Sequence, residues 1–62
     1  MDKDHLLEEI TEGLNELSPL SSTIIKQSVN GNQDGLYLTL IEIELIIENL
    51  ASYVVALKRA MR

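Results

Sequence analysis

The chain has 62 residues, no cysteine, one histidine and a formal net charge of −5. This length allows one domain, whose core is marginal without a stabilising cross-link, a metal ion or a second subunit. The lack of cysteine excludes disulfides and thiolate metal sites, and one histidine leaves little for an imidazole site. Association with another chain therefore remains as the stabilising device.

The excess negative charge lies in the first segment of the chain. Residues 1–17 carry six carboxylates and one lysine, whereas the later segments are neutral. Like charges repel nucleic acid and anionic lipid, so we expect neither as a direct partner and instead expect a protein, one with a basic surface. A charged start without a signal peptide and an apolar run interrupted by three glutamates predict a cytoplasmic protein without a membrane span.

The first predicted element is a helix over residues 4–17. Leu7, Ile10, Leu14 and Leu17 repeat at helical spacing, and Asp2 and Asp4 favour the positive end of the helix dipole. We expect Pro19 to end this helix, because its ring clashes with the carbonyl four residues earlier. The helix also carries an acidic stripe of four residues, which are Glu8, Glu9, Glu12 and Glu16. This stripe is a candidate face for a protein partner, and the alternative is that it is simply a solvated face.

Residues 19–29 form the second predicted element, a short helix. Ser18 is a good N-cap, and Pro19 suits the first helical position. The β-branched run at 23–25 also fits a strand, and the helix is the favoured interpretation. Residues 30–38 follow as a loop, since Asn30-Gly31 and Asp34-Gly35 are typical of turns; a β-hairpin is the alternative if residues 36–39 are extended.

The third predicted element is a long helix over residues 40–61. Thr39 and Glu42 match a capping box, and Leu38 and Ile43 lie where a hydrophobic staple would form. An apolar seam with alternating spacings of four and three follows this helix, and we expect it to mediate self-association. The seam consists of Leu36, Leu40, Ile43, Ile47, Leu50, Val54, Leu57 and Met61. It is flanked on the same helix by Ile46, Tyr53 and Ala60.

These elements predict an all-α fold for the single domain 1–62. We expect a three-helix unit, or two long helices with a short connector, that forms a dimeric helical bundle. Two alternatives stay open. The two shorter helices cover the seam and its flank within one chain, or the seam and its flank bind a different protein. Ile and Leu mixed along the seam do not choose between a dimer and a higher oligomer.

No catalytic, metal or cofactor site is predicted. His5 lies near Glu8 and Glu9, but a single histidine beside mobile carboxylates is a poor metal site. Glu42 and Glu44 are two residues apart, so on a helix they point to different faces and do not form an acid–base pair. No phosphate-binding glycine pattern occurs, and the loop lacks the acidic ligands of a calcium site.

The sequence therefore predicts a non-enzymatic helical protein without a cofactor. It would dimerise through its C-terminal helix and act by protein–protein interaction as an adaptor, regulator or inhibitor. An acidic decoy that blocks a nucleic-acid-binding protein is one alternative, because the charge is confined to residues 1–17. A small subunit of a larger assembly is another.

Overall fold

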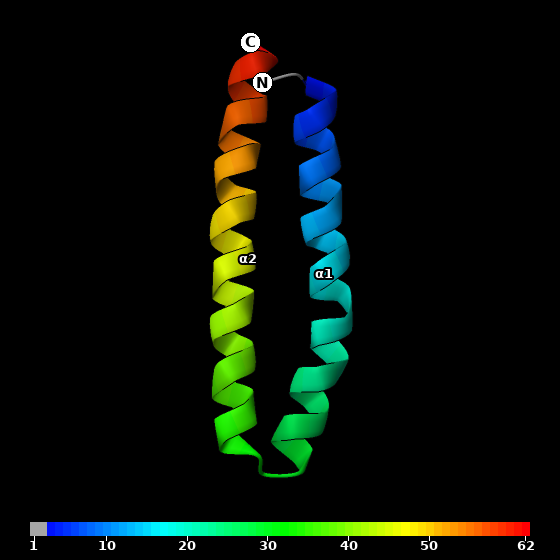
Figure 1. Cartoon of the computed structure of the whole chain (residues 1–62), viewed down its shortest axis with the longest axis vertical. Helices are drawn as coiled ribbons and strands as arrows, with labels where there is room; N and C mark the ends of the chain where they lie inside the picture. The colour runs from blue at the N-terminus through cyan, green and yellow to red at the C-terminus, as the bar shows by residue number, and fades with distance from the viewer. Residues whose placement is uncertain (1–2) are drawn as a thin grey trace.

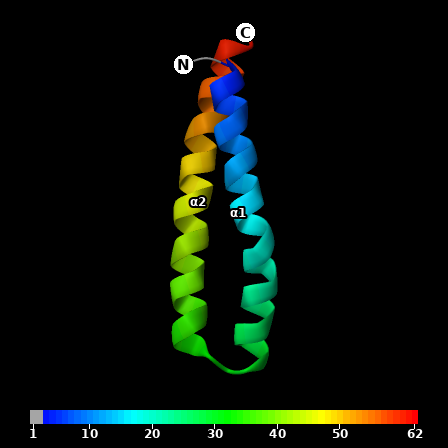
Figure 2. The ribbon, with the colours of Figure 1, turned by 45° about the vertical axis from the view of Figure 1, so that its right-hand side comes forward.

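The fold is an antiparallel hairpin of two long helices (Figure 1), seen in a computed structural model that describes residues 3–62. Helix α1 spans Lys3–Val29 and helix α2 spans Gln33–Ala60. The helices lie side by side in both ribbon views (Figures 1 and 2), and the start of α1 lies near the end of α2. The described residues contain no strand, so the all-α prediction is confirmed for them.

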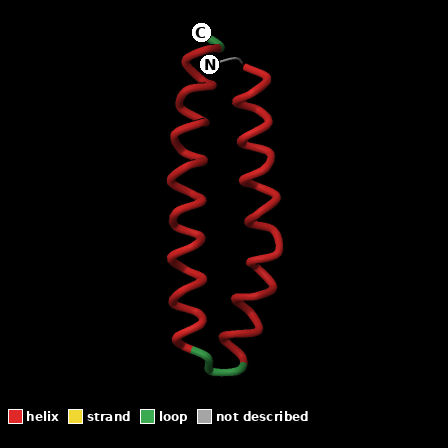
Figure 3. Tube along the Cα trace, viewed as in Figure 1, coloured by secondary structure: helices red, strands yellow, loops and turns green. Residues whose placement is uncertain are grey.

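The predicted break between the first two helices is wrong. Residues 4–17 and 19–29 belong to one helix, α1, which contains Pro19 and runs without a loop from end to end (Figure 3). The fold is thus two long helices, not a three-helix unit. Leu17 and Leu20 on either side of Pro19 are both half-buried, so packing on α2 holds the two halves in line. The helix bows outward near its middle, as a proline inside a helix requires (Figure 2).

The connection between the helices takes three residues, 30–32, where the sequence predicted a loop over 30–38. Gly31 has a φ of +68°, the left-handed conformation that ends many helices. The Asn32 amide donates to the Gln27 carbonyl at 2.9 Å and the Gly31 amide to the Ser28 carbonyl at 3.2 Å. This is the Schellman pattern, and it satisfies the last carbonyls of α1.

Helix α2 starts at Gln33, seven residues before the predicted start at residue 40. Its N-cap is Asn32, whose side-chain oxygen accepts from the Gly35 amide at 3.0 Å. The predicted capping box is wrong, because Thr39 lies inside the helix and its hydroxyl contacts the Gln27 side chain of α1 at 2.9 Å. The helix ends at Ala60, close to the predicted end. Asp2, expected near the positive end of the first helix, lies outside the described residues.

The interface between the helices is one narrow stripe on each. On α2 the residues with reduced exposure include a row at alternating spacings of three and four, which consists of Leu36, Thr39, Ile43, Ile46, Leu50, Tyr53 and Leu57. On α1 the same pattern holds for Leu6, Ile10, Gly13, Leu17, Leu20, Ile24 and Gln27. We call these fourteen residues the inner stripe. Such spacing is that of two helices packed as an antiparallel coiled coil.

The helices approach closely where Gly13 of α1 meets Leu50 of α2. A methyl group placed on Gly13 would overlap the Leu50 side chain, so only glycine fits without movement. This contact fixes the pairing of the helices, with residue 13 level with residue 50. Leu6 is the one fully buried hydrophobic side chain among the described residues, at 1% exposure, and the core of the hairpin is correspondingly thin.

Candidate interaction surfaces

The predicted self-association seam is divided by the fold. Leu36, Ile43, Leu50 and Leu57 belong to the inner stripe and are half-buried against α1. The alternate members remain exposed: Leu40 by 49%, Ile47 by 51%, Val54 by 41% and Met61 by 67%. Half of the seam is therefore used within the chain, and half stays exposed. Of the predicted flank, Ile46 and Tyr53 join the inner stripe, and Ala60 is exposed.

The exposed half of the seam shares one side of the hairpin with leucines of α1. Leu7 and Leu14 each follow an inner-stripe residue directly, as Leu40, Ile47 and Val54 do on α2. One residue further along a helix is a turn of about 100°. Because the helices are antiparallel and face each other, this turn carries the side chains of both helices to the same side.

We call this side the apolar face. Its exposed hydrophobic residues are Leu7, Leu14, Ile25, Tyr37, Leu40, Ile47, Val54 and Met61. Ile25 and Tyr37 also directly follow inner-stripe residues, Ile24 and Leu36, and are therefore turned to the same side. The face extends along both helices, whereas the sequence placed the self-association surface on the C-terminal helix only.

The opposite side of the hairpin carries an acidic groove. Glu9 and Glu16 directly precede inner-stripe residues, which turns them to this side. With Glu12 they line a hollow of about 140 Å³ whose floor and far wall come from α2. The residues that complete the lining are Gly13, Ile46, Asn49, Leu50 and Tyr53. Three of the four predicted acidic residues thus gather at one groove, and Glu8 is not among its lining residues.

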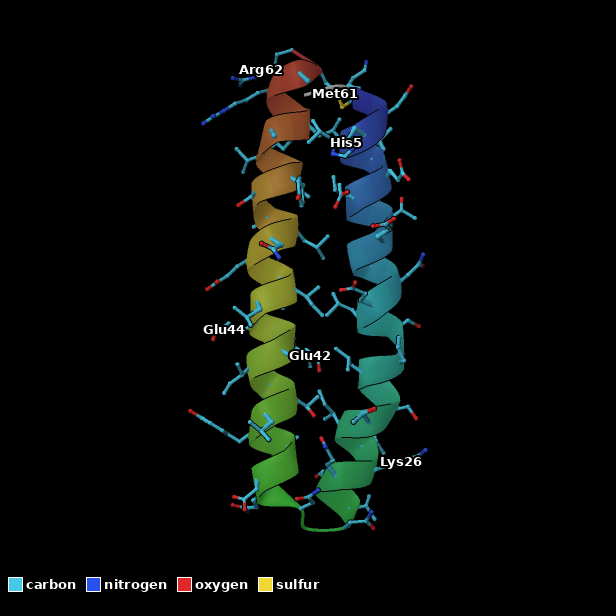
Figure 4. All side chains as sticks on the ribbon, viewed as in Figure 1. His5, Lys26, Glu42, Glu44, Met61 and Arg62 are labelled. Atoms are coloured by element: carbon cyan, nitrogen blue, oxygen red, sulfur yellow. The ribbon has the colours of Figure 1, made fainter. Side chains whose placement is uncertain are left out.

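The remaining polar candidates are exposed and dispersed. His5 Nε2 lies 3.9 Å from Glu9 Oε1, and its side chain is about half exposed. In Figure 4 the Glu42 side chain extends toward α1 and Glu44 points away from it, so the two carboxylates occupy different faces as predicted. Within residues 3–62 no group of three or more histidine, cysteine or acidic residues is arranged to hold a metal ion.

The contribution of α1 to the apolar face was missed because its leucines were assigned to a single helix stripe. Leu7 and Leu14 are seven residues apart, as are Ile10 and Leu17, and the sequence pattern treats the four as one set. The structure covers Ile10 and Leu17 and exposes Leu7 and Leu14. Leu6, which the sequence pattern places beside this set, and Gly13, which carries no apolar signal, indicate where the inner stripe runs.

Comparison with known protein families, curated proteins and solved structures gives no significant match. No helix in the described part of the chain combines the length and apolar character needed to cross a membrane. The function proposed below therefore rests on the surfaces of the hairpin itself.

Proposed function

We propose that this chain is a small helical interaction protein. It dimerises through α2 and acts by binding another protein, as an adaptor, regulator or inhibitor. One observation carries the proposal: the hairpin exposes thirteen large hydrophobic side chains, by 38% to 80% each, and fully buries one. Single exposed hydrophobic residues are ordinary, but rows of them along both helices mark an interaction surface.

The thin core supports the same proposal. The inner stripe supplies one layer of contacts between two helices, and helical folds of stable domains have at least one further layer. The radius of gyration is 14.5 Å, whereas a compact domain of this length has about 11 Å. A second helical layer on the hairpin would remove the apolar rows from water and make the assembly more compact.

Thermal unfolding at several protein concentrations tests self-association. Association stabilises the folded state by mass action, so the unfolding midpoint measured by circular dichroism rises with protein concentration. A midpoint that stays constant over a hundredfold dilution range, with full helicity at the lowest concentration, would reject dimerisation. Poor helicity at every concentration would reject it as well and would point to a different protein as the missing layer.

A second candidate function is that of an acidic decoy for a basic protein. The gathering of Glu9, Glu12 and Glu16 at one groove supports it, since charge complementarity gives specificity to protein contacts. The probe is a fluorescent oligo-arginine peptide, with binding read by anisotropy. Reversing Glu12 and Glu16 to lysine should weaken binding more than reversing Glu8 and Glu48, which changes the net charge equally outside the groove. Equal losses would reject a specific acidic site.

A further inference from the structure

We propose that two copies of the hairpin stack through their apolar faces, with α2 antiparallel to α2 of the second copy. The product is a four-helix bundle whose two loops lie at opposite ends. This inference rests on the proposed self-association and adds to it the face, the contribution of α1 and the orientation of the copies. It also predicts that the two acidic grooves point outward on opposite sides of the bundle.

The charges of the hairpin decide which side the second copy covers. A two-fold contact brings each surface against its own copy. On the groove side this would bury Glu9, Glu12 and Glu16 of both copies in one interface, with their charges removed from water. On the apolar face the residues turned toward the second copy are mainly Leu, Ile and Val. The apolar face is therefore the side that self-association buries.

The surface area of the hairpin matches this arrangement. Its accessible surface is 4868 Å², whereas a monomeric protein of 7.0 kDa exposes about 4,000 Å². The excess is close to the roughly 800 Å² that each partner contributes to a standard protein–protein interface. The elongated shape, 46 by 15 by 13 Å, makes the whole length of the face available to a second hairpin of equal length.

The spacing of the exposed residues of α2 favours the antiparallel orientation. Leu40 and Val54 are each seven residues from Ile47, so stacking α2 on its own copy about Ile47 places Leu40 against Val54 of the second copy. Because residue 13 is level with residue 50, the level of Ile47 in α1 falls near residue 16. Leu7 and Ile25 are each nine residues from that point, so they also meet across the interface.

The alternative orientation, with both loops at one end, matches less well. It stacks α1 on α2 of the second copy and sets Ser21 and Ser28 against the end of α2 that carries Tyr37 and Leu40. The stacked helices run antiparallel in both orientations, so the helix dipoles favour neither, and the apolar contacts decide between the two.

Cysteine cross-linking tests the face and the orientation, since the natural chain has no cysteine. Ile47→Cys lies on the two-fold axis, and Leu45→Cys, at 57% exposure against 51%, is a matched control turned away from the apolar face. On oxidation we expect the disulfide dimer of Ile47→Cys to form about tenfold faster than that of Leu45→Cys, because proximity raises the effective thiol concentration. Mixing Leu40→Cys with Val54→Cys should give mainly the mixed disulfide.

The outcomes separate this inference from the function on which it rests. Circular dichroism first checks that each variant keeps its helicity. A dimeric protein in which Ile47→Cys and Leu45→Cys cross-link equally slowly would overturn the proposed face and leave dimerisation intact. Fast cross-linking at Ile47 with no mixed Leu40–Val54 product would overturn the orientation. A monomeric protein would overturn both this inference and the proposed self-association.

Discussion

Replacing Gly13 by alanine tests the contact that sets the pairing of the two helices. In an exposed helix interior this substitution stabilises by about 1 kcal/mol, because alanine has the higher helix propensity. Here the new methyl group overlaps the Leu50 side chain, whose Cγ lies 2.9 Å from the position of the added carbon. Overpacking of this kind costs about 1–3 kcal/mol, so we expect Gly13→Ala to lower the free energy of unfolding by roughly 1 kcal/mol.

The same substitution made in a Leu50→Ala background provides the control. With the Leu50 side chain truncated, the overlap disappears and the helix-propensity gain of about 1 kcal/mol should return. The double-mutant cycle, measured by urea denaturation at one protein concentration, should therefore give a coupling of about 1–3 kcal/mol. If Gly13→Ala stabilises the natural chain by the full propensity gain, Gly13 does not lie against Leu50 and the register of the hairpin is wrong.

Three further substitutions test other parts of the fold by urea denaturation. Leu6→Ala should lower the free energy of unfolding by about 2–3 kcal/mol, because Leu6 is fully buried. The exposed control Leu38→Ala should change it by less than about 0.5 kcal/mol, and equal effects would refute the assigned core. Asn32→Ala should cost about 1 kcal/mol through loss of the N-cap, and no loss would argue against a helix start at residue 33. Gly31→Ala should cost about 1–2 kcal/mol because of its left-handed backbone; a neutral result would contradict that conformation.

The sequence predicts the long C-terminal helix well and the first half of the chain less well. Periodic apolar residues over 40–61 mark a helix that the structure contains, and its end lies within a residue of the expected one. The start was wrong because Thr39 and Glu42 match a capping box that is not used. Asn32 caps the helix earlier, and Thr39 instead donates to Gln27 across the interface.

Pro19 illustrates why local rules were insufficient in the first half. A proline inside a helix removes one backbone hydrogen bond, which usually ends the helix. In this chain Leu17 and Leu20 pack on α2 on both sides of the proline, and that contact requires a continuous helix. The sequence pattern does not reveal this packing, because it depends on how the two helices pair. The pairing in turn depends on positions such as Gly13 that carry no apolar signal.

The candidate surfaces were predicted in part. Glu9, Glu12 and Glu16 meet at one groove, as the acidic stripe indicated, and Glu8 lies outside its lining. The seam correctly grouped apolar residues on the C-terminal helix, but only alternate members of it lie on the side that faces α1. The half with Leu50 packs on α1, and the half with Ile47 remains exposed. That division follows from the register of the hairpin.

Sedimentation equilibrium of the natural chain is the direct test of self-association, because it gives the mass of the folded protein in solution. We expect a helical species of twice the 7.0 kDa monomer mass that dissociates on dilution. A fully helical species of 7.0 kDa at every concentration would contradict it, since the apolar face would then be stable in water without a second copy.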